Sequence, residues 1–389
     1  MTVAWLSFFP VEWLPDAPAA VRNLPRLHPS TWQRVLLEEL EKEPSIRLHI
    51  LVLRKQFAAN QSFTRNGVVF HLIKTRGGMR APSLFWHDTL LVKRALKTIR
   101  PDLLHAWGTE EGAALVASRL HYPYLVTIQG LMSWMSELFP LTIRERLAAR
   151  LESVSLARAG VVTAESNFSA GFIRRKYPHL TVRHVDVTPA RLFHRVERRP
   201  QTDPFRLVFV AGLGPRKGGD LLISALDRLK DEIPFELLVI GGAEPAFLGK
   251  MKSITSAAVW ERVQFKNNLE PAQIAEELGR AALMVCPTRA DTGPMAVKEA
   301  VVAGVPVVGS NVGGVPDYVI PGKNGLLFET GNLEACIQAI RSAWHHPLFG
   351  KGLVDANTLA ELRQQLSVER MGRSFFETYR AINGPKEVP

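Results

Sequence analysis

The feature that most constrains the fold of this chain is an alternation of short apolar strands with helices, which runs twice along its length. The first series extends from the apolar run Val3–Phe9 to a strand at Thr181–Asp186, and the second begins with a strand at Phe205–Ala211. Between them, residues 188–204 hold prolines, arginines and few large apolar side chains, which is typical of an exposed linker. Strands that alternate with helices form parallel sheets covered on both faces. We therefore predict an α/β protein with two doubly wound domains.

The alternation also sets the domain boundaries. We predict a Rossmann-like N-terminal domain over residues 1–190, a linker over 191–204, and a Rossmann-like C-terminal domain over 205–366. Residues 367–389 contain a last helix with its apolar residues on one face. Ligands of doubly wound sheets bind at the carboxyl ends of the strands, so the cleft between the two domains is the expected site.

Composition excludes several classes of protein. Of the 389 residues, 46% are apolar and 22% are charged, which suits a globular chain and not a disordered or coiled-coil one. No stretch is long and apolar enough for a membrane-spanning helix, and Met1–Pro10 lacks the basic leader of a signal peptide. With two cysteines only, a disulfide framework is not expected, and the cytoplasm is the expected compartment.

The chain is basic, with 48 Lys and Arg against 37 Asp and Glu and a formal net charge of +11. Such a surplus suits nucleic acid, acidic lipid headgroups or phosphorylated small molecules, although a solvated basic surface explains it as well. No recognisable nucleic-acid-binding module is present, so nucleic acid is not an expected partner. The helices predicted at Leu91–Arg100 and Leu141–Arg158 carry cations beside apolar faces, which predicts at most a peripheral, salt-reversible association with an anionic membrane.

The first loop that carries chemistry follows the strand at Phe205–Ala211 and precedes a helix predicted at Gly219–Lys230. Glycines in such a loop let backbone N–H groups approach an anion, and the helix N-terminus adds a positive potential. Two adjacent cations favour phosphate binding, while a dinucleotide turn and a plain structural turn remain alternatives. The candidate phosphate-binding residues are Gly212, Gly214, Arg216 and Lys217.

The second such loop precedes a helix predicted at Met295–Ala303. Gly293 and Pro294 open this helix, and a proline in the first turn leaves the following N–H groups free for an anion. Asp291 lies on the loop and Glu299 about one turn inside the helix, so both can face one pocket. Carboxylates accept hydrogen bonds from hydroxyl groups, which favours a sugar or ribose ligand. The alternatives are that Asp291 is only a turn residue and that Glu299 is only a solvated helix position.

These loops resemble a known family. The runs Phe209–Leu226 and Pro287–Gly325 contain a lysine before a glycine, two acids separated by seven residues, and the sequence Ala303-Gly-Val-Pro-Val-Val308. They are similar to the C-terminal domain of the retaining glycosyltransferases of family four, which have the GT-B fold. His105-Ala-Trp and Thr127-Ile-Gln-Gly carry a weaker likeness in the N-terminal half. The resemblance implies two facing Rossmann-like domains and a C-terminal helix that crosses back onto the first.

The resemblance implies a metal-independent glycosyltransferase of the hexosyltransferase type. It would move a sugar from a nucleotide diphosphate sugar to a hydroxyl of a sugar, glycan or lipid-linked acceptor, with retention and without a further cofactor. Such enzymes often act in polysaccharide or glycoconjugate biosynthesis at the inner membrane face. The absence of Asp-x-Asp, His-Glu-x-x-His and Cys-x-x-Cys agrees with a site that needs no metal. A nucleotide-sugar epimerase of the same fold and a non-catalytic nucleotide-sugar-binding protein remain alternatives.

The resemblance also implies roles for single residues. Lys217 would bind the donor phosphates, Glu299 the ribose and Asp291 the hydroxyls of the donor sugar. The backbone N–H groups expected to meet the diphosphate are those that flank Pro294, namely Gly293, Met295 and Ala296.

Three positions depart from the family pattern. Gly212 stands where an arginine is usual, Asp291 where a glutamate is usual, and Gln129 where a histidine is usual. Arg216 is therefore expected to supply the second cation. Gln129 follows the strand predicted at Tyr124–Ile128, and a glutamine there can only donate and accept hydrogen bonds, so it is expected to orient a sugar hydroxyl.

Overall fold

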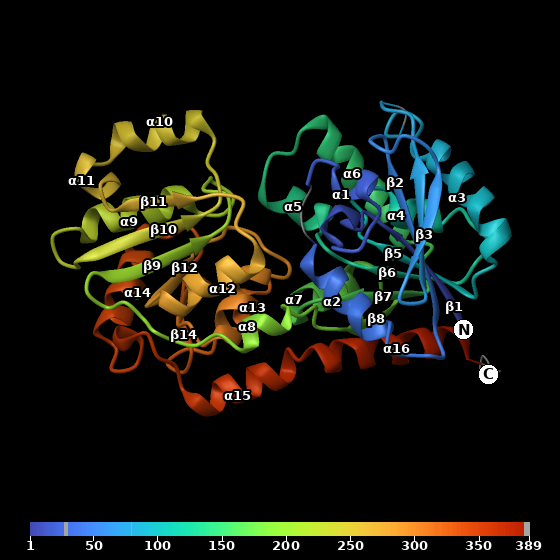
Figure 1. Cartoon of the computed structure of the whole chain (residues 1–389). Coiled ribbons are helices and arrows are strands. Elements are labelled where there is room, and N and C mark those ends of the chain that lie inside the picture. The colour runs from blue at the N-terminus through green and yellow to red at the C-terminus, as the bar shows by residue number, and fades with distance from the viewer. Residues whose placement is uncertain (27–29, 79, 385–389) are drawn as a thin grey trace. The chain divides into compact units, whose positions relative to one another are not determined.

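The computed structural model describes residues 1–26, 30–78 and 80–384. The chain divides into two compact units, each with its own α/β fold (Figure 1). The first unit combines residues 1–187 with the C-terminal segment from Val368, and the second unit comprises residues 188–367.

In the first unit, strands and helices alternate in the predicted order. The strands are β1 (Thr2–Ser7), β2 (Arg47–Arg54), β3 (Gln61–Arg65), β4 (Val68–Lys74), β5 (Leu103–Trp107), β6 (Tyr124–Thr127), β7 (Val161–Ala164) and β8 (Thr181–His184). The helices are η1 (Val11–Trp13), α1 (Ala19–Arg22), α2 (Thr31–Leu40), α3 (Trp86–Ile99), α4 (Ala113–Ala117), α5 (Met132–Leu138), α6 (Ile143–Leu156), α7 (Asn167–Lys176) and α16 (Val368–Asn383).

The described part of the first unit forms an eight-stranded sheet in the order β3-β4-β2-β1-β5-β6-β7-β8. All neighbouring strands are parallel except β3, which pairs antiparallel with β4 at the edge of the sheet. The sequence analysis missed β3, because its side chains are mostly exposed and polar. Asn66 and Gly67, with φ of 47° and 81°, form the turn between the two strands. An Asn-Gly pair between strands is a strong hairpin signal, so the β3–β4 hairpin could have been predicted from the sequence.

The C-terminal helix α16 packs on the first unit, as the resemblance implies. It lies against α2 and β5, and Figure 1 shows it in red beside the sheet. Its Tyr379 hydroxyl accepts a hydrogen bond from the indole nitrogen of Trp5 at 3.0 Å and lies 2.7 Å from Nδ1 of His105. The ring of Phe375 stacks on His105 at a centroid distance of 5.5 Å. Buried aromatic and hydrogen-bonded contacts therefore fix this helix to β1 and β5.

The second unit repeats the alternation. Its strands are β9 (Phe205–Val210), β10 (Phe235–Ile240), β11 (Val263–Lys266), β12 (Leu283–Cys286), β13 (Val307–Ser310) and β14 (Gly325–Phe328). Its helices are α8 (Arg191–His194), α9 (Gly219–Leu229), α10 (Pro245–Ile254), α11 (Ala257–Trp260), α12 (Pro271–Arg280), α13 (Met295–Ala303), η2 (Val315–Asp317), α14 (Leu333–His345), η3 (Phe349–Lys351) and α15 (Ala356–Gln365).

Within residues 188–367, all of which the structure describes, the strands form a six-stranded parallel sheet in the order β11-β10-β9-β12-β13-β14. Side chains alternate across a strand, so β9 feeds two cores. Leu207 and Phe209 pack in one core with α9 and α14, and Val208 packs in the other with α12 and α13. The prediction of two α/β domains with parallel sheets is thus confirmed, except that β3 adds an antiparallel edge strand to the first sheet.

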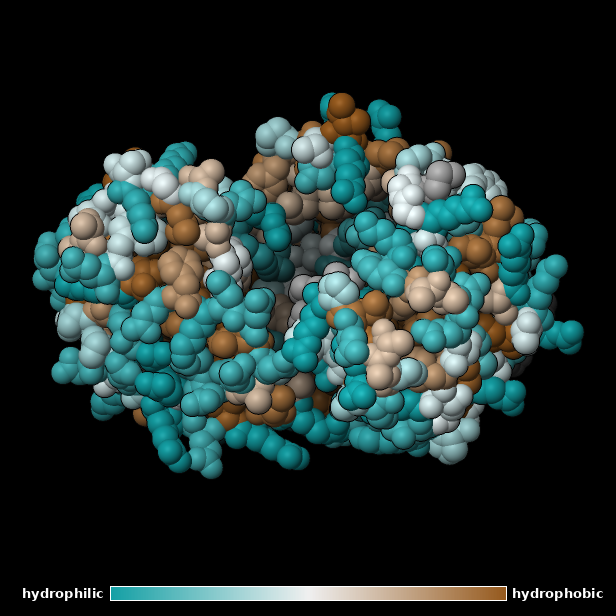
Figure 2. All heavy atoms as spheres, turned by 45° about the horizontal axis from the view of Figure 1, so that its top comes forward, coloured by the Kyte–Doolittle hydropathy of each residue, from teal (hydrophilic) through white to brown (hydrophobic). Residues whose placement is uncertain are grey.

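Residues 191–204, predicted as a linker, pack on the second unit. The helix α8 places Phe193, which is fully buried, in the core beside α13. The Arg198 guanidinium donates hydrogen bonds to the carbonyl oxygens of Ala281 and Gly352, each at 2.7 Å. The face of the molecule in Figure 2 carries many hydrophilic side chains, with hydrophobic side chains in smaller groups between them.

Candidate functional site

The predicted phosphate-binding loop joins β9 to α9 in a tight turn. Gly218 is the N-cap of α9 with φ of +74°, and a Cβ atom there would lie 1.9 Å from the carbonyl oxygen of Pro287. Only glycine fits such a position without displacing backbone. The carbonyl of Gly214 accepts the N–H of Gly219 at 2.9 Å, which closes the loop on itself. The loop therefore packs directly against the segment that follows β12.

Lys217 and Asp291 meet across these two loops. The Lys217 ammonium lies 2.5 Å from Oδ2 of Asp291, although the two residues are 74 positions apart in the sequence. Both side chains are partly exposed, so a ligand can reach them. Arg216 beside them is exposed and makes no ion pair with any described residue. The structure thus brings together one candidate phosphate ligand and one candidate sugar ligand.

Arg289 braces the same loops, and the sequence analysis missed it. Its guanidinium makes a two-pronged ion pair with Asp220 at 2.7 and 2.9 Å and donates to the carbonyl of Pro215. Its own N–H donates to the carbonyl of Arg216 at 2.9 Å. A bidentate arginine fixes geometry as well as charge, so Arg289 holds the backbone around Lys217 in place. Because Arg289 and Asp220 are distant in sequence, no local sequence pattern predicts this ion pair.

The start of α13 presents unsatisfied backbone donors. Among the described residues, none accepts a hydrogen bond from the N–H of Gly293, Met295 or Ala296. Pro294 is the N-cap residue, and α13 continues for nine residues to Gly304, where φ is +80°. The first N–H groups of a helix and its dipole favour an anion, so this end of α13 suits a phosphate.

Glu299 lies in the second turn of α13 with an 8% exposed side chain. It makes no hydrogen bond or ion pair with any residue that the structure describes. Burial raises the pKa of the Glu299 carboxyl from 4.5 to about 8. A buried acid without a partner is costly unless a ligand supplies one. Glu299 was predicted either to bind a sugar or ribose hydroxyl or to be a solvated helix position. Its burial excludes the solvated position.

A cavity of about 660 Å³ lies between the β9–α9 loop and the loop that follows β10. Its size falls in the range of small-molecule sites. One wall is formed by residues 212–217, which include Gly212, Gly214, Arg216 and Lys217, and the other by residues 242–245 and Phe247. All four candidate residues of the first loop therefore line one cavity at the carboxyl end of the sheet, as predicted for a doubly wound fold.

In the first unit, Gln129 follows β6 at the carboxyl end of the sheet and lies beside Glu110, which the sequence analysis did not single out. A Cβ atom on Gly108 would lie 2.6 Å from Oε2 of Glu110 and 3.1 Å from Oε1 of Gln129. Burial, with the nearby charge of Glu152, raises the pKa of the Glu110 carboxyl to about 7. The helix α4 begins only at Ala113, so Glu110 stands in the loop at the strand end.

His105 has a structural role. It is fully buried, its Nε2 lies 2.6 Å from the hydroxyl of Thr127, and its Nδ1 contacts Tyr379 of α16. Burial lowers the pKa of the imidazole well below its usual value, so the ring is neutral. Its likeness to the family therefore reflects the docking of α16 and not a contact with substrate.

Comparison with known proteins defines the class. A family model of the glycosyl transferases group 1 matches residues 191–361, and a model of Glycosyltransferase Family 4 matches residues 35–189. The structure is similar to a sucrose-phosphate synthase from Thermosynechococcus elongatus, with a TM-score of 0.80, 16% identity and 98% of each chain covered. It is also similar to Anabaena HepE in complex with UDP and glucose, with a TM-score of 0.71 and 16% identity over 98% of this chain and 100% of that one.

Two α/β domains of this kind define the GT-B fold. The chain belongs to the family-four type of these glycosyltransferases, since the two models together span most of it. Curated relatives include glycogen synthase of Mycobacterium tuberculosis, 26% identical over 64% of this chain and 61% of the relative. Another is a GDP-mannose-dependent phosphatidylinositol monomannoside mannosyltransferase of Mycolicibacterium smegmatis, 29% identical over 34% of this chain and 37% of the relative. The matches thus span less than two thirds of either relative's length.

Neither a membrane-spanning helix nor a metal-binding cluster is found among the described residues. No helix among them is long and apolar enough to span a membrane. No cluster of three or more His, Cys, Asp or Glu side chains in that part of the chain is arranged to hold a metal ion.

Proposed function

We propose that this glycosyltransferase uses a nucleotide diphosphate sugar as donor and that the second unit holds it. The observation that carries the proposal is the juxtaposition of Lys217 and Asp291 across two loops whose backbone is fixed by Arg289. A cation for the diphosphate and a carboxylate for sugar hydroxyls are thereby placed within contact of each other. The solved complexes of HepE with UDP and with UDP-glucose agree with such a donor.

The remaining donor-side residues fit the same ligand. The free N–H groups of Gly293, Met295 and Ala296 suit the diphosphate, with Arg216 as an additional cation. The buried, unpartnered Glu299 suits the ribose hydroxyls, which would satisfy it. Gly212 and Gly214 line the cavity without side chains, so the ligand can approach the backbone there.

In the proposed reaction, the bond between the sugar carbon and the phosphate oxygen breaks, and a bond from that carbon to the acceptor oxygen forms. Lys217 and the α13 N-terminus stabilise the departing diphosphate as positive charge develops on the sugar. The acceptor proton passes to the diphosphate, which leaves with the nucleotide. Retention of configuration and independence from metal belong to this proposal, as does the role of Gln129 in orienting a sugar hydroxyl.

We also propose a biosynthetic role in glycan or glycoconjugate assembly with peripheral contact to an anionic membrane. The support is α6, where Ile143 is 79% exposed beside Arg144, Arg146 and Arg150. A helix that exposes apolar and cationic side chains together can rest on a charged lipid surface. The relatives that act on sugar polymers or lipid-linked sugars are consistent with such an acceptor.

The proposed donor function is tested with a panel of nucleotide sugars, two further ligands and three variants. A panel that includes UDP-glucose and GDP-mannose is screened by thermal shift, because a ligand of the folded state raises its stability. The nucleotide diphosphate of the best donor and inorganic pyrophosphate are then titrated by calorimetry. Lys217→Ala should weaken both, Glu299→Gln should weaken the nucleotide but not pyrophosphate, and the surface control Arg228→Ala should change neither.

Turnover distinguishes this function from the alternatives. A transferase releases nucleotide diphosphate slowly with water and faster with an acceptor, an epimerase interconverts donor sugars without releasing it, and a binding protein does neither. No binding of any nucleotide sugar in the panel would refute the donor function.

A further inference from the structure

Two histidines of the first unit contact each other across neighbouring strands. His49 lies on β2 and His71 on β4, and in the parallel register of these strands His49 is opposite Val69 while His71 is opposite Leu51. Because side chains two positions apart share one face of a sheet, the two histidines are diagonal neighbours on the same face. Nδ1 of His49 lies 3.0 Å from Nε2 of His71, and the two rings are stacked with their centroids 5.3 Å apart.

The contact continues to the edge strand β3. Ser62 is opposite His71 in the antiparallel pairing of β3 with β4, and its hydroxyl lies 3.1 Å from Nδ1 of His71. Ser62, His71 and His49 thus form one chain of side-chain hydrogen bonds across three adjacent strands. This chain adds to the backbone hydrogen bonds that join the β3–β4 hairpin to β2.

The hydrogen bond between the two rings requires at least one neutral imidazole. A neutral imidazole has one donor and one acceptor nitrogen, whereas both nitrogens of a charged imidazole are donors. With both rings neutral, or with one ring charged, a nitrogen of one ring can donate to a nitrogen of the other. With both rings charged, two N–H groups face each other and two positive charges stand in contact. Protonation of both rings therefore breaks the hydrogen bond.

The groups around the pair do not offset positive charge. Arg47 lies two residues before His49 on β2, and Arg94 of α3 lines a cavity of about 290 Å³ together with His71. No acidic side chain is among the described residues that line this cavity, and on the other side of β2, Ala4 of β1 is opposite His49. Burial, with the neighbouring positive charges, lowers the pKa of both imidazoles, that of His71 to about 4. The pair is therefore neutral at pH 7.

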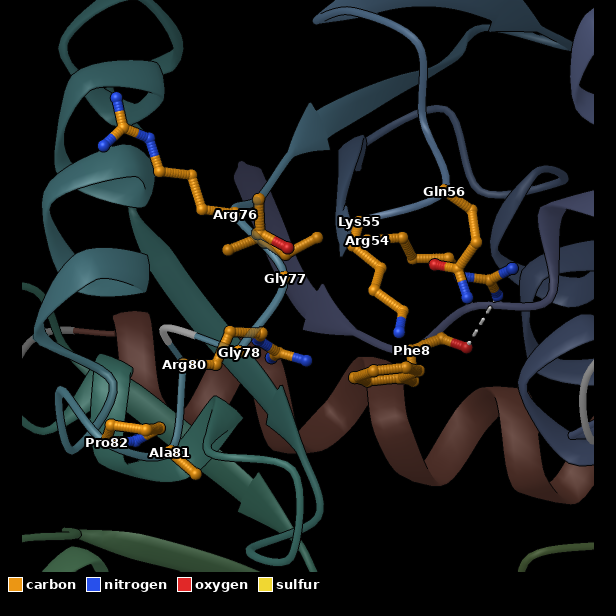
Figure 3. A pocket seen from close by; sticks show the side chains of 12 residues that line it. Phe8, Arg54, Lys55, Gln56, Arg76, Gly77, Gly78, Arg80, Ala81 and Pro82 are labelled. Carbon is orange, nitrogen blue, oxygen red and sulfur yellow. Dashed lines mark hydrogen bonds between the residues drawn. The ribbon is translucent and has the colours of Figure 1, made fainter.

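The two strands that the histidines join also form the walls of another cavity. Residues 53–56 at the end of β2 and residues 75–78 after β4 line a cavity of about 230 Å³, together with Phe8 and residues 80–82 (Figure 3). The ladder between β2 and β4 runs from His49 and Val69 to the strand ends that reach this cavity. A change in the attachment of β4 to β2 would therefore change the cavity as well.

We propose that the His49–His71 pair is an acid-sensitive lock on the β3–β4 hairpin. Near neutral pH, both rings are neutral and their hydrogen bond ties β4 to β2. In acid, both rings take up protons, the contact breaks, and the hairpin opens more readily than the rest of the sheet. The edge strand β3 is expected to open first, because it pairs on one side only and its side chains are mostly exposed.

The pH dependence of stability tests the lock without any nucleotide or acceptor. Histidines of the unfolded chain bind protons near pH 6.5 and the folded pair only at lower pH, so the stabilisation is complete above about 6.5 and is lost as the pH falls. Between pH 7 and pH 5, the unfolding equilibrium constant of the wild type should rise at least about tenfold more than that of His71→Gln, whose side chain does not titrate. Chemical denaturation measures both, and the contribution of Glu299 is common to the two proteins.

A matched control separates the pair from histidines in general. His121 is exposed and belongs to the same unit, so His121→Gln should follow the wild type at both pH values. His49→Gln provides a second variant if His71→Gln does not fold, since it removes the same contact from β2.

Hydrogen exchange tests whether the opening is local. After correction for the intrinsic pH dependence of exchange, the amides of residues 61–74 should lose at least about tenfold more protection between pH 7 and pH 5 than those of β9 and β10. In His71→Gln, this pH-dependent difference should disappear. Two results would overturn the proposal: parallel stability profiles of the wild type and both histidine variants, or protection of residues 61–74 that does not change between pH 7 and pH 5.

Discussion

The two units differ in the partners of particular polar side chains at the carboxyl ends of their sheets. In the second unit, cations near the candidate donor site are held by carboxylates of the facing loop, Lys217 by Asp291 and Arg289 by Asp220. In the first unit, the sheet edge leaves Lys55 and the hydroxyl of Thr75 without partners among the described residues. Paired loops are preorganised before a ligand arrives, whereas an unpaired edge gains most of its order from the ligand. If the proposed function holds, the donor loops are preorganised by ion pairs, whereas Lys55 and Thr75 in the first unit have no such partners among the described residues.

The largest expected effect breaks the rigid side of this comparison. Gly218→Ala places a Cβ against the carbonyl of Pro287 at a residue with positive φ, so we expect a loss of about 3 kcal/mol or more in the free energy of unfolding, by analogy with strained and overpacked sites. Gly249→Ala in α10 is the matched control, since nothing lies within 4 Å of its Cβ position. Chemical denaturation measures both. A Gly218→Ala protein as stable as wild type would show that the backbone of the turn shifts at little cost in free energy.

Glu299 is the exception on the rigid side, and its pKa predicts a pH dependence. A carboxyl whose pKa is raised to about 8 on folding contributes stability that is complete below its unfolded value near 4.5 and is lost as the pH rises through 8. Between those limits, the wild type should lose up to about 1.4 kcal/mol per pH unit relative to Glu299→Gln. Denaturation at pH 5.5 and pH 8 checks the difference between the two proteins. Parallel curves would mean that Glu299 is already ionised at neutral pH.

On the acceptor side, Gln129 tests whether the sheet edge contributes to transfer. Gln129→Ala removes one neutral hydrogen-bonding group, so turnover should fall about threefold to tenfold with little change in nucleotide affinity. Gln129→His should keep part of the activity and add a titration near pH 6–7 to the rate profile. Steady-state kinetics with the best donor supply both numbers. Wild-type rates in Gln129→Ala would remove the side chain from the reaction.

The smallest effect concerns the exposed face of α6 in the first unit. If α6 rests on anionic lipid, each cation contributes about 1 kcal/mol, so Arg146→Ala should weaken co-sedimentation with phosphatidylglycerol vesicles a few-fold at low salt. High salt should abolish the binding of the wild type as well. Arg228→Ala in the second unit serves as the control. Absence of co-sedimentation at low salt would reject membrane contact and favour a soluble acceptor.

The two units also differ in how much of their structure the sequence predicts. In the second unit, local features were predictable and long-range contacts were not. The turn around Gly218 and the helix from Met295 to Ala303 were predictable, because glycine, proline and apolar spacing act over a few residues. The pairing of Lys217 with Asp291 was not, because 74 positions separate them and only the parallel order of β9 and β12 joins their loops. Local sequence signals thus identify the candidate donor-site residues, but they do not predict which of these residues contact each other.

The acceptor side was less predictable for a physical reason. A cavity of the first unit is assembled from segments at the ends of β1, β2 and β4, none of which carries a motif of its own. The segment after Glu110 is apolar and helix-forming, yet α4 starts three residues later and leaves Glu110 in a loop, which the sequence does not indicate. The net charge of +11 suggested phosphorylated partners, and only the tertiary structure shows which cations are paired, such as Arg54 with Glu12, and which make no ion pair with a described residue, such as Lys55.

The proposed function depends most on Lys217 binding the donor diphosphate while Asp291 binds the hydroxyls of the donor sugar. Calorimetric titration of the nucleotide diphosphate into wild type, Lys217→Ala and Asp291→Ala tests this most directly. Loss of a charge-assisted contact should cost Lys217→Ala about 1.5–3 kcal/mol, whereas Asp291→Ala should keep its nucleotide affinity and lose turnover. Equal affinity of wild type and Lys217→Ala would contradict the account.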